Sequence, residues 1–237
     1  MFNPQLQFTA DGSHTLYIPE MEEHYHSVNG AIQESLHVYI EAGLNHYFFE
    51  THRHIEHIDI HIENKSINVL EFGFGTGLNA FLTIIEAEKR NLQINYITIE
   101  KYPLPEAITN QLNYAKEFPE KFQAYFSQIH ACEWENFARI STHFQIKKIQ
   151  ADFSDFRFED NYDVIFYDAF APDKQSDVWS QEIFNKIFQH TNPEGILTTY
   201  CAKGNIRRMM QAAGFQTERI PGPPGKREML RALTKQK

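Results

Sequence analysis

Three glycines at alternate positions, Gly73, Gly75 and Gly77, come directly after a short apolar segment that ends at Phe72. Glycine has no Cβ and accepts positive φ, so this run permits a tight turn at which an adenosine-bearing ligand can approach the main chain. A dinucleotide site uses the spacing G-x-G-x-x-G and holds a pyrophosphate at a helix N-terminus. The spacing G-x-G-x-G instead favours S-adenosylmethionine, which has no phosphates. A tight turn without a ligand is the competing interpretation.

Acidic residues stand at the ends of four apolar segments, at Glu71, Glu100, Asp152 and Asp168. The carboxylate of Glu100 can accept hydrogen bonds from ribose hydroxyls, and Asp152 with Phe153 can hold an adenine. We therefore predict a cofactor site formed by Glu71, Gly73, Gly75, Thr76, Gly77, Asn79, Glu100, Lys101, Asp152 and Phe153.

The segment from Asp168 to Pro172 places a carboxylate, the aromatic ring of Phe170 and a rigid turn after another apolar segment. Methyl transfer from a sulfonium is an in-line displacement, so orientation of the acceptor is most of the catalysis. An aliphatic ammonium must also lose a proton, which a carboxylate can accept or relay. We predict Asp168 as the catalytic residue, although its ordinary pKa of about 3.9 makes it a weak base. A helix cap is the alternative role for Asp168.

Strand and helix candidates alternate from residue 67 onwards, and these elements must position the residues above. Strands are expected at 67–72, 94–100, 146–151, 162–167 and 195–200, and two more flank the turn 221–225. Helices are expected from 78 and at 105–118, 181–189 and 205–213, the last of them ending at Gly214. The pattern predicts an α/β fold with a mostly parallel sheet, helices on both faces, and ligands at the carboxyl ends of the strands.

The first 65 residues do not follow this alternation and contain a helix candidate at 31–41. We expect residues 1–65 to form an extension packed on the sheet or covering the site, and residues 66–237 to form the main domain. The two cysteines, Cys132 and Cys201, form no disulfide or metal pattern. No apolar run reaches the roughly 18 residues of a membrane span. We therefore expect a soluble, cytoplasmic protein with no membrane partner.

The charge of the chain is unevenly distributed. The chain carries a net charge of −9, yet nine basic and only two acidic residues lie between Lys203 and Lys237. An acidic protein is unsuited to bind nucleic acid as a whole, because phosphate contacts require Lys and Arg. The basic end is either a solvated surface or a local docking patch on an acidic body.

Several motifs together resemble the MnmC methyltransferase family. They are residues 72–79, the segment 168–172 with 177–179, the N-terminal residues 30–44, and the stretch from Arg207 to the closing G-K-R-E-M-L at 225–230. The resemblance implies an α/β, Rossmann-like class I methyltransferase domain at 66–237, with a mostly parallel seven-stranded sheet and an antiparallel C-terminal strand, and S-adenosyl-L-methionine as cofactor. Members of this family methylate the exocyclic amine of 5-aminomethyl-2-thiouridine at the wobble position of tRNA, which yields 5-methylaminomethyl-2-thiouridine.

The resemblance also implies partners. Better-known members are fused to an FAD-dependent oxidase, whereas we expect no FAD domain in this chain and a separate enzyme that supplies the aminomethyl substrate. The tRNA anticodon loop becomes the expected partner, with phosphate contacts from Arg207, Arg208, Lys226 and Arg227 and stacking of the target uridine on Phe170. Lys226 and Arg227 could instead brace Glu228 or the substrate pocket. Residues 201–205 and 221–224 depart from the family pattern on the substrate side.

Two other functions stay open from the residues alone: methylation of a small-molecule amine, and a catalytically silent nucleotide-binding partner subunit. The histidine-rich segment 51–61 has His54, His57 and His61 at a spacing that could share one helical face and bind a metal. A solvated connecting segment is the preferred interpretation, and no metal site is predicted.

Overall fold

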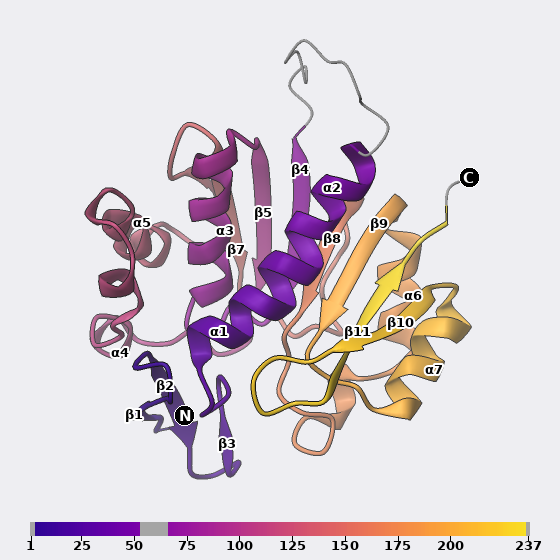
Figure 1. Ribbon diagram of the computed structural model, residues 1–237, viewed down its shortest axis with the longest axis horizontal. Coiled ribbons are helices and arrows are strands. Elements are labelled where there is room, and N and C mark those ends of the chain that lie inside the picture. Colours follow the sequence, from indigo (N-terminus) through magenta and orange to yellow (C-terminus); the bar gives the residue numbers. More distant parts are fainter. Residues whose placement is uncertain (1–2, 53–65, 236–237) are drawn as a thin grey trace.

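A single large sheet organises the molecule, which is a computed structural model that describes residues 3–52 and 66–235 (Figure 1). The sheet has eight strands within these residues. In spatial order they are β10 (Gln216–Pro221), β11 (Glu228–Leu233), β9 (Thr191–Thr199), β8 (Tyr162–Tyr167), β4 (Ile67–Phe72), β5 (Ile94–Ile99), β7 (Phe144–Ile149) and β6 (Phe137–Arg139). The five strands from β9 to β7 are parallel, whereas β11, β10 and β6 each run antiparallel to the strand they join.

The expected mostly parallel α/β sheet with an antiparallel C-terminal strand is confirmed, but the expected number of seven strands is wrong. The additional strand is β6, which has only three residues and pairs with β7 at the sheet edge. A segment this short carries too little alternation of apolar and polar residues to be recognised as a strand. β6 lies at the opposite edge of the sheet from β10.

Helices connect the parallel strands. α3 (Leu78–Arg90) follows β4, α6 (Gln181–Gln189) follows β8, and α7 (Gly204–Ala213) follows β9. The predicted ranges for the last two helices are confirmed to within one residue. Ser180 caps the N-terminus of α6, because its hydroxyl accepts a hydrogen bond from the Ile183 N–H. Gly214 caps the C-terminus of α7, and its φ of 122° suits a residue without a Cβ.

The helix predicted at 105–118 is wrong. That region contains the short helix α4 (Glu106–Thr109) and a 3₁₀ turn, η2 (Tyr114–Glu117), and it is followed by α5 (Glu120–Ala131). Asn113 explains the interruption, because its side chain accepts a hydrogen bond from the His14 N–H at 2.8 Å and donates to the Gly12 carbonyl. Asn113 therefore holds the turn between β1 (Gln5–Phe8) and β2 (His14–Ile18) in place instead of continuing a helix.

The N-terminal residues form a small sheet and a long helical run. The sheet consists of β1 (Gln5–Phe8), β2 (His14–Ile18) and β3 (Glu23–His24). The run consists of α1 (Ala31–Ser35), the π-type segment η1 (Leu36–Asn45) and α2 (His46–His52), so it extends beyond the predicted range 31–41. A Cβ at Gly43 would lie 3.1 Å from the Phe166 ring, so glycine lets η1 pack closely on β8.

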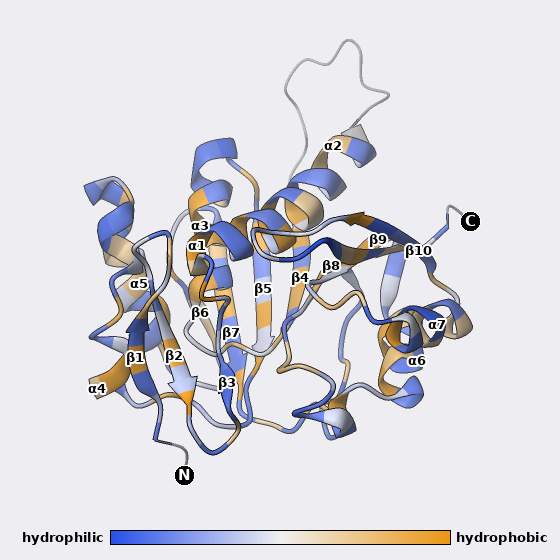
Figure 2. Cartoon of the chain, turned by 60° about the horizontal axis from the view of Figure 1, so that its bottom comes forward, coloured by the Kyte–Doolittle hydropathy of each residue, from blue (hydrophilic) through white to orange (hydrophobic). Residues whose placement is uncertain are grey.

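Two apolar layers enclose the sheet because successive side chains of a strand point to opposite faces. Val69, Val164 and Ile196 belong to the layer beneath η1, α3 and α5. Leu70, Ile165 and Leu197, each one residue later, belong to the layer beneath α6 and α7, together with residues such as Phe184 and Met210. Figure 2 shows apolar colour along the central strands and on the sheet side of the helices.

Two further expectations concern the chain as a whole. Cys132 and Cys201 are both free thiols, as predicted. No helix among residues 3–52 and 66–235 combines the length and apolarity needed to cross a bilayer. The metal interpretation of His54, His57 and His61 concerns residues that lie outside the described ranges.

Candidate active site

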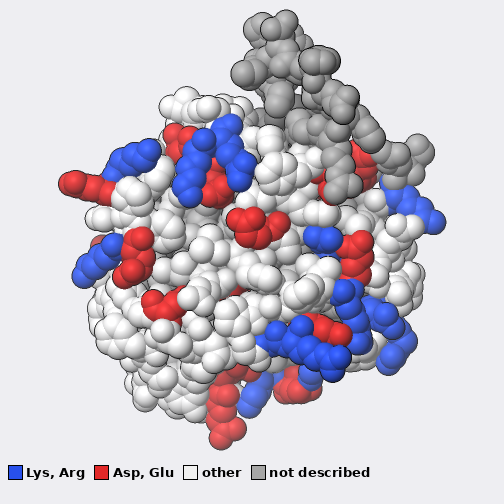
Figure 3. Space-filling model, in the orientation of Figure 1, with Lys and Arg blue, Asp and Glu red and all other residues white. Residues whose placement is uncertain are grey.

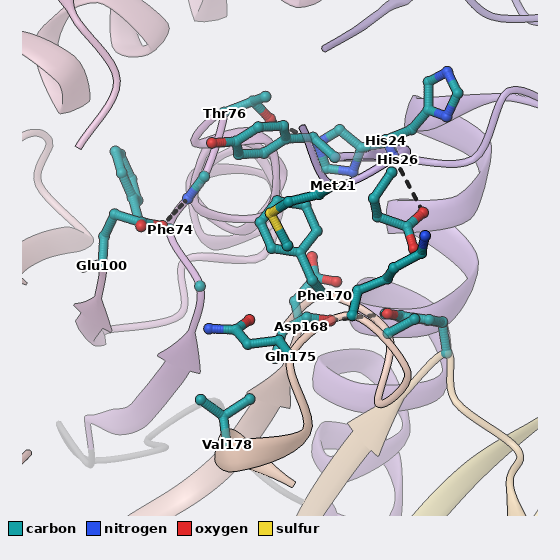
Figure 4. A pocket seen from close by; sticks show the side chains of 18 of the residues that line it. Met21, His24, His26, Phe74, Thr76, Glu100, Asp168, Phe170, Gln175 and Val178 are labelled. Carbon is teal, nitrogen blue, oxygen red and sulfur yellow. Dashed lines mark hydrogen bonds between the residues drawn. The ribbon is translucent and has the colours of Figure 1, made fainter. Parts of the chain in front are cut away.

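A cavity of about 650 Å³ opens at the carboxyl ends of the parallel strands (Figure 4). Its walls are the turns after β4, β5, β7 and β8, the residue Tyr200 after β9, and the N-terminal segment 21–28. Small-molecule sites typically have volumes of roughly 300 to 1,000 Å³. The position and size are those expected of a ligand site in an open α/β sheet.

The glycine loop lies between the sheet and the N-terminal segment. Gly73, Gly75 and Gly77 have φ values of 98°, 48° and 73°, in the region that favours glycine. A Cβ at Gly73 would lie 2.5 Å from the backbone oxygen of Asp168, and one at Gly75 would lie 3.0 Å from the Tyr25 ring. The positive φ values agree with the predicted tight turn, and these glycines also allow close contact with protein atoms.

Two histidines hold the glycine loop through contacts with Thr76. His26 Nε2 and Thr76 Oγ1 share a hydrogen bond of 2.6 Å, and His130 Nε2 lies 3.1 Å from the Thr76 carbonyl oxygen. Burial lowers the pKa of both histidines to about 4, so both rings are neutral at physiological pH. Because a carbonyl oxygen only accepts, His130 donates from Nε2. Neither histidine was predicted, because both are far from the loop in sequence: His26 precedes α1, and His130 lies on α5.

Glu100 lies beside the glycine loop, as its position after the second strand suggested. Its Oε2 accepts a hydrogen bond from the Gly75 N–H at 3.0 Å, and its Oε1 accepts one from the Tyr102 N–H at 2.8 Å. Burial raises the pKa of this carboxyl, although the two backbone donors oppose that shift. The side chain is held in place from two directions and also lines the cavity.

The same end of the cavity contains Lys101, Asp152 and Phe153. Lys101 Nζ lies 2.6 Å from Asp152 Oδ2, and this contact lowers the pKa of the Asp152 carboxyl. The Phe153 ring packs edge-on against Phe72, with centroids 5.2 Å apart. The structure thus brings these predicted residues together with Glu100 at one end of the cavity.

Asn79 connects two carboxylates. Its Nδ2 donates to Glu71 Oε1 at 3.0 Å and to Asp168 Oδ2 at 2.8 Å, while Thr98 Oγ1 donates to Glu71 Oε2 at 2.7 Å. Asn79 and Asp168 line the cavity, but Glu71 is fully buried and does not. The structure therefore does not place Glu71 where we expected it, in contact with a cofactor. Glu71 instead accepts a hydrogen bond from Asn79, which lines the cavity.

Both carboxyls of this network hold protons more tightly than usual. Burial raises the pKa of Glu71 to about 8, and the neighbouring charge of Asp168 adds to the shift. Burial likewise raises the pKa of Asp168 to about 7; Glu34 adds to this shift, whereas the Asn79 hydrogen bond and Lys226 oppose it. Asp168 is consequently a far stronger base than an exposed aspartate.

The turn after β8 is held by neighbours on both sides. Trp179 Nε1 donates to the Phe170 carbonyl and the Tyr200 hydroxyl donates to the Ala169 carbonyl, each at 2.8 Å. The Phe170 ring meets the Tyr25 ring edge to face, with centroids 5.1 Å apart. Phe170 and Tyr25 both line the cavity, so its end around Asp168 has aromatic walls.

Lys226 also belongs to this end of the cavity. Its Nζ lies 2.7 Å from Glu34 Oε1 on α1 and 3.9 Å from the centroid of the Tyr200 ring. Of the roles that the sequence left open for Lys226, the structure thus shows contact with the pocket rather than with Glu228, whose carboxylate pairs with Arg219.

The other three basic residues predicted to contact tRNA lie outside the cavity lining. Arg208 and Arg227 are exposed and Arg207 is half-buried. Figure 3 shows Lys and Arg side chains gathered on the face over α7, β10 and β11. Some of these cations are neutralised locally, since Arg231 lies 2.8 Å from Glu218 and Arg219 lies 3.0 Å from Glu228.

The N-terminal residues were expected to pack on the sheet or cover the site, but none of them was predicted individually as a site residue. Met21, Tyr25, His26 and Glu34 all line the cavity. Glu34 was among the residues that carry the family resemblance, but no spacing connected it to Asp168. No group of three or more His, Cys, Asp or Glu side chains in the described part of the chain is arranged to hold a metal ion.

Comparisons with known proteins agree with this geometry. The family model described as S-adenosyl-L-methionine-dependent methyltransferase matches residues 112–235. The tRNA 5-methylaminomethyl-2-thiouridine biosynthesis bifunctional protein MnmC of Hydrogenovibrio crunogenus (strain DSM 25203 / XCL-2) is 27% identical over 198 residues. That match covers 79% of this chain and 29% of the relative, so the chain spans less than a third of that relative's length.

A solved structure has a similar fold. The crystal structure of MNMC2 from Aquifex aeolicus matches with a TM-score of 0.77 and 24% sequence identity, over 100% of this chain and 72% of that chain. The expected Rossmann-like α/β fold is thereby confirmed, and the 27% identity to MnmC agrees with the resemblance that the sequence motifs indicate.

Proposed function

The chain belongs to the family of S-adenosyl-L-methionine-dependent methyltransferases, and we propose that it methylates the aminomethyl nitrogen of 5-aminomethyl-(2-thio)uridine at the tRNA wobble position. The product is 5-methylaminomethyl-(2-thio)uridine. The observation that carries this proposal is Asp168, a carboxyl of raised pKa that lines the cavity beside the glycine loop. The name of the MnmC relative, which refers to biosynthesis of this nucleoside, supports the choice of substrate.

The cavity fits S-adenosyl-L-methionine. Glu100 offers a fixed carboxylate for ribose hydroxyls, and Phe153 with the Lys101–Asp152 pair offers an apolar ring and polar groups for adenine. The residues that would hold the amino-acid part are Gly73, Gly75, Thr76, Gly77 and Asn79. When bound, this cofactor supplies a methyl group on a positively charged sulfur.

Asp168 has two tasks in this proposal. Its carboxylate holds the acceptor ammonium and accepts one proton from it, which leaves the nitrogen lone pair free to form the new N–C bond. A primary amine with an ordinary pKa of about 10.4 would lose its proton to an aspartate of pKa about 3.9 at a cost of about 9 kcal/mol. With the pKa of Asp168 raised to about 7, the cost falls to about 5 kcal/mol.

Recognition of RNA is assigned to residues outside the cavity. Arg207, Arg208 and Arg227 are candidates for phosphate contacts around the anticodon loop, because a chain of net charge −9 needs a local basic surface to bind RNA. A wobble uridine turned out of the loop could enter the cavity and stack on Phe170. In this proposal a separate enzyme supplies the aminomethyl group.

The proposal is tested by incubating the protein with methyl-labelled S-adenosyl-L-methionine and either tRNA bearing aminomethyluridine, the same tRNA lacking that group, or free primary amines. We expect label in the aminomethyl tRNA alone. Equal transfer to free amines would favour a small-molecule methyltransferase. Absence of cofactor binding in calorimetry would favour a silent partner subunit, and bound cofactor without transfer to the aminomethyl tRNA would overturn the proposed substrate.

A further inference from the structure

An ion pair crosses the acceptor end of the cavity between residues far apart in the chain. Glu34 lies on α1 and Lys226 lies in the turn between β10 and β11, and Lys226 Nζ is 2.7 Å from Glu34 Oε1. The Glu34 side chain is only 8% exposed. Its second oxygen, Oε2, accepts a hydrogen bond from the Ser27 N–H at 2.8 Å. Both oxygens of this carboxylate are thus occupied.

The turn that carries Lys226 is fixed against the N-terminal segment. The His37 ring lies 2.8 Å from the Pro221 carbonyl oxygen. Gly225 has a φ of 84°, and a Cβ there would lie 2.0 Å from Asn29 Nδ2, so only glycine permits this approach. These contacts direct Lys226 into the cavity, where its ammonium lies over the Tyr200 ring.

The pair lies close to Asp168. The Lys226 ammonium lies over the ring of Tyr200. The hydroxyl of the same tyrosine donates a hydrogen bond to the carbonyl of Ala169, the residue after Asp168. The groups that act on Asp168 come from each neighbouring element: Glu71 on β4, Tyr96 on β5, Asn79 on α3, Glu34 on α1, Tyr39 on η1, Tyr200 after β9 and Lys226. Lys101 and Lys174 also line the cavity, but they pair with Asp152 and Glu22.

We propose that Glu34 and Lys226 are positioning residues that act as one neutral unit and make Asp168 the carboxylate that receives the acceptor ammonium. Unpaired, Glu34 would compete for a cationic acceptor at the same end of the cavity. Unpaired, Lys226 would repel that acceptor. Paired, they restrict the site to a single positive charge beside Asp168, which suits one primary ammonium carried on a flat ring. This inference rests on the proposed function.

The first test measures the titration of the Asp168 carboxyl by NMR in protein with ¹³C-labelled aspartate side chains, without cofactor or tRNA. Asp168→Asn identifies the resonance. Glu34→Gln removes a negative charge, so we expect the pKa of Asp168 to fall by about one unit, whereas Lys226→Met should raise it by about one unit. The double variant should lie between the two. Shifts in the same direction, or no shift, would overturn the inference.

Two control variants separate charge from shape. Lys226→Arg keeps the positive charge and should leave the pKa of Asp168 close to the wild-type value. Lys174→Met removes a lysine from the same cavity that pairs with the exposed Glu22, and the pKa of Asp168 should again stay unchanged. A shift in Lys174→Met as large as in Lys226→Met would show that the pair has no special role.

The second test uses aminomethyl tRNA and separates kcat from KM. Lys226→Met should lower kcat at least tenfold with little change in KM for tRNA, and adding Glu34→Gln should restore most of that loss because no unpaired carboxylate remains. A rise in KM with a weaker salt dependence would instead make Lys226 a phosphate contact. Inactive wild-type protein would refute the proposed function, while the NMR result would still decide whether the pair acts on Asp168.

Discussion

The two ends of the cavity are built in different ways. At the end proposed to bind the cofactor, Glu100 and Lys101 follow β5 and Asp152 follows the neighbouring strand β7, and each side chain is held by a nearby backbone group or by its neighbour. At the end proposed to bind the acceptor, Glu34 and Lys226 meet across 192 positions of sequence. In the proposed function, cofactor binding therefore depends on local turns, whereas acceptor positioning depends on how the N-terminal residues and the C-terminal strands pack together.

The largest expected effect separates the two ends. Asp168→Asn keeps the shape and the Asn79 contact but removes the proton acceptor, so we expect kcat to fall by about 10²- to 10⁴-fold. The dissociation constant for S-adenosyl-L-methionine, measured by calorimetry, should change by less than about threefold, well under 1 kcal/mol. If cofactor binding is lost instead, Asp168 belongs to the cofactor end.

The reciprocal change concerns Glu100. Glu100→Ala removes the ribose acceptor and the partner of the Gly75 N–H, so we expect cofactor affinity to fall by about 10- to 100-fold, or about 1.4 to 2.7 kcal/mol. At saturating cofactor, kcat should be nearly unchanged. Glu100→Gln keeps one carbonyl oxygen and can accept only one of the two backbone hydrogen bonds, so it should show a smaller loss than Glu100→Ala; equal losses would mean that the full carboxylate is required.

Stability against pH tests the buried network between the two ends. Because the folded pKa of Glu71 is raised to about 8, the folded state binds more protons than the unfolded state between the ordinary glutamate pKa and 8. The free energy of unfolding should therefore decrease as pH rises through this window. In Glu71→Gln the free energy of unfolding should fall less between pH 5 and pH 8.5 than in wild type. Urea unfolding at pH 5, 7 and 8.5 measures this difference. An identical slope in wild type and variant would contradict the buried, protonated Glu71.

The smallest effects are expected on the basic surface outside both ends. Replacement of Arg208 or Arg227 by Gln should raise KM for tRNA by only a few-fold each and reduce the slope of log KM against log salt by somewhat less than one unit. kcat should stay close to wild type. Unchanged KM and salt slope in both variants would move the tRNA contacts elsewhere on the protein.

How much the sequence reveals differs between the same two ends. The glycine run, Glu100 and Asp152 were predictable because a βα unit places the residues after each strand at one edge of the sheet. The pairing of Glu34 with Lys226 was not, because nothing in local spacing reports which residues meet across 192 positions. Asp168 was found from its place after a buried strand, but its raised pKa depends on burial and on Glu34.

The fold shows the same division. α6 and α7 were predicted to within one residue because they have clear amphipathic patterns and recognisable ends. The region around Asn113 was misjudged because a tertiary hydrogen bond to His14 interrupts the helix there. Glu71 was assigned to the cofactor because its strand-end position looks like that of Glu100. Only the structure shows that Asn79 lies between Glu71 and the cavity.

One measurement tests the central claim most directly: mass spectrometry of the nucleosides released from aminomethyl tRNA after a single turnover with wild-type protein and with Asp168→Asn. We predict that wild-type protein converts the wobble nucleoside to its methylaminomethyl form, and that Asp168→Asn leaves it unchanged although cofactor is bound. A methyl group found at any other nucleoside, or equal conversion by Asp168→Asn, would contradict the assignment of Asp168 to the acceptor amine.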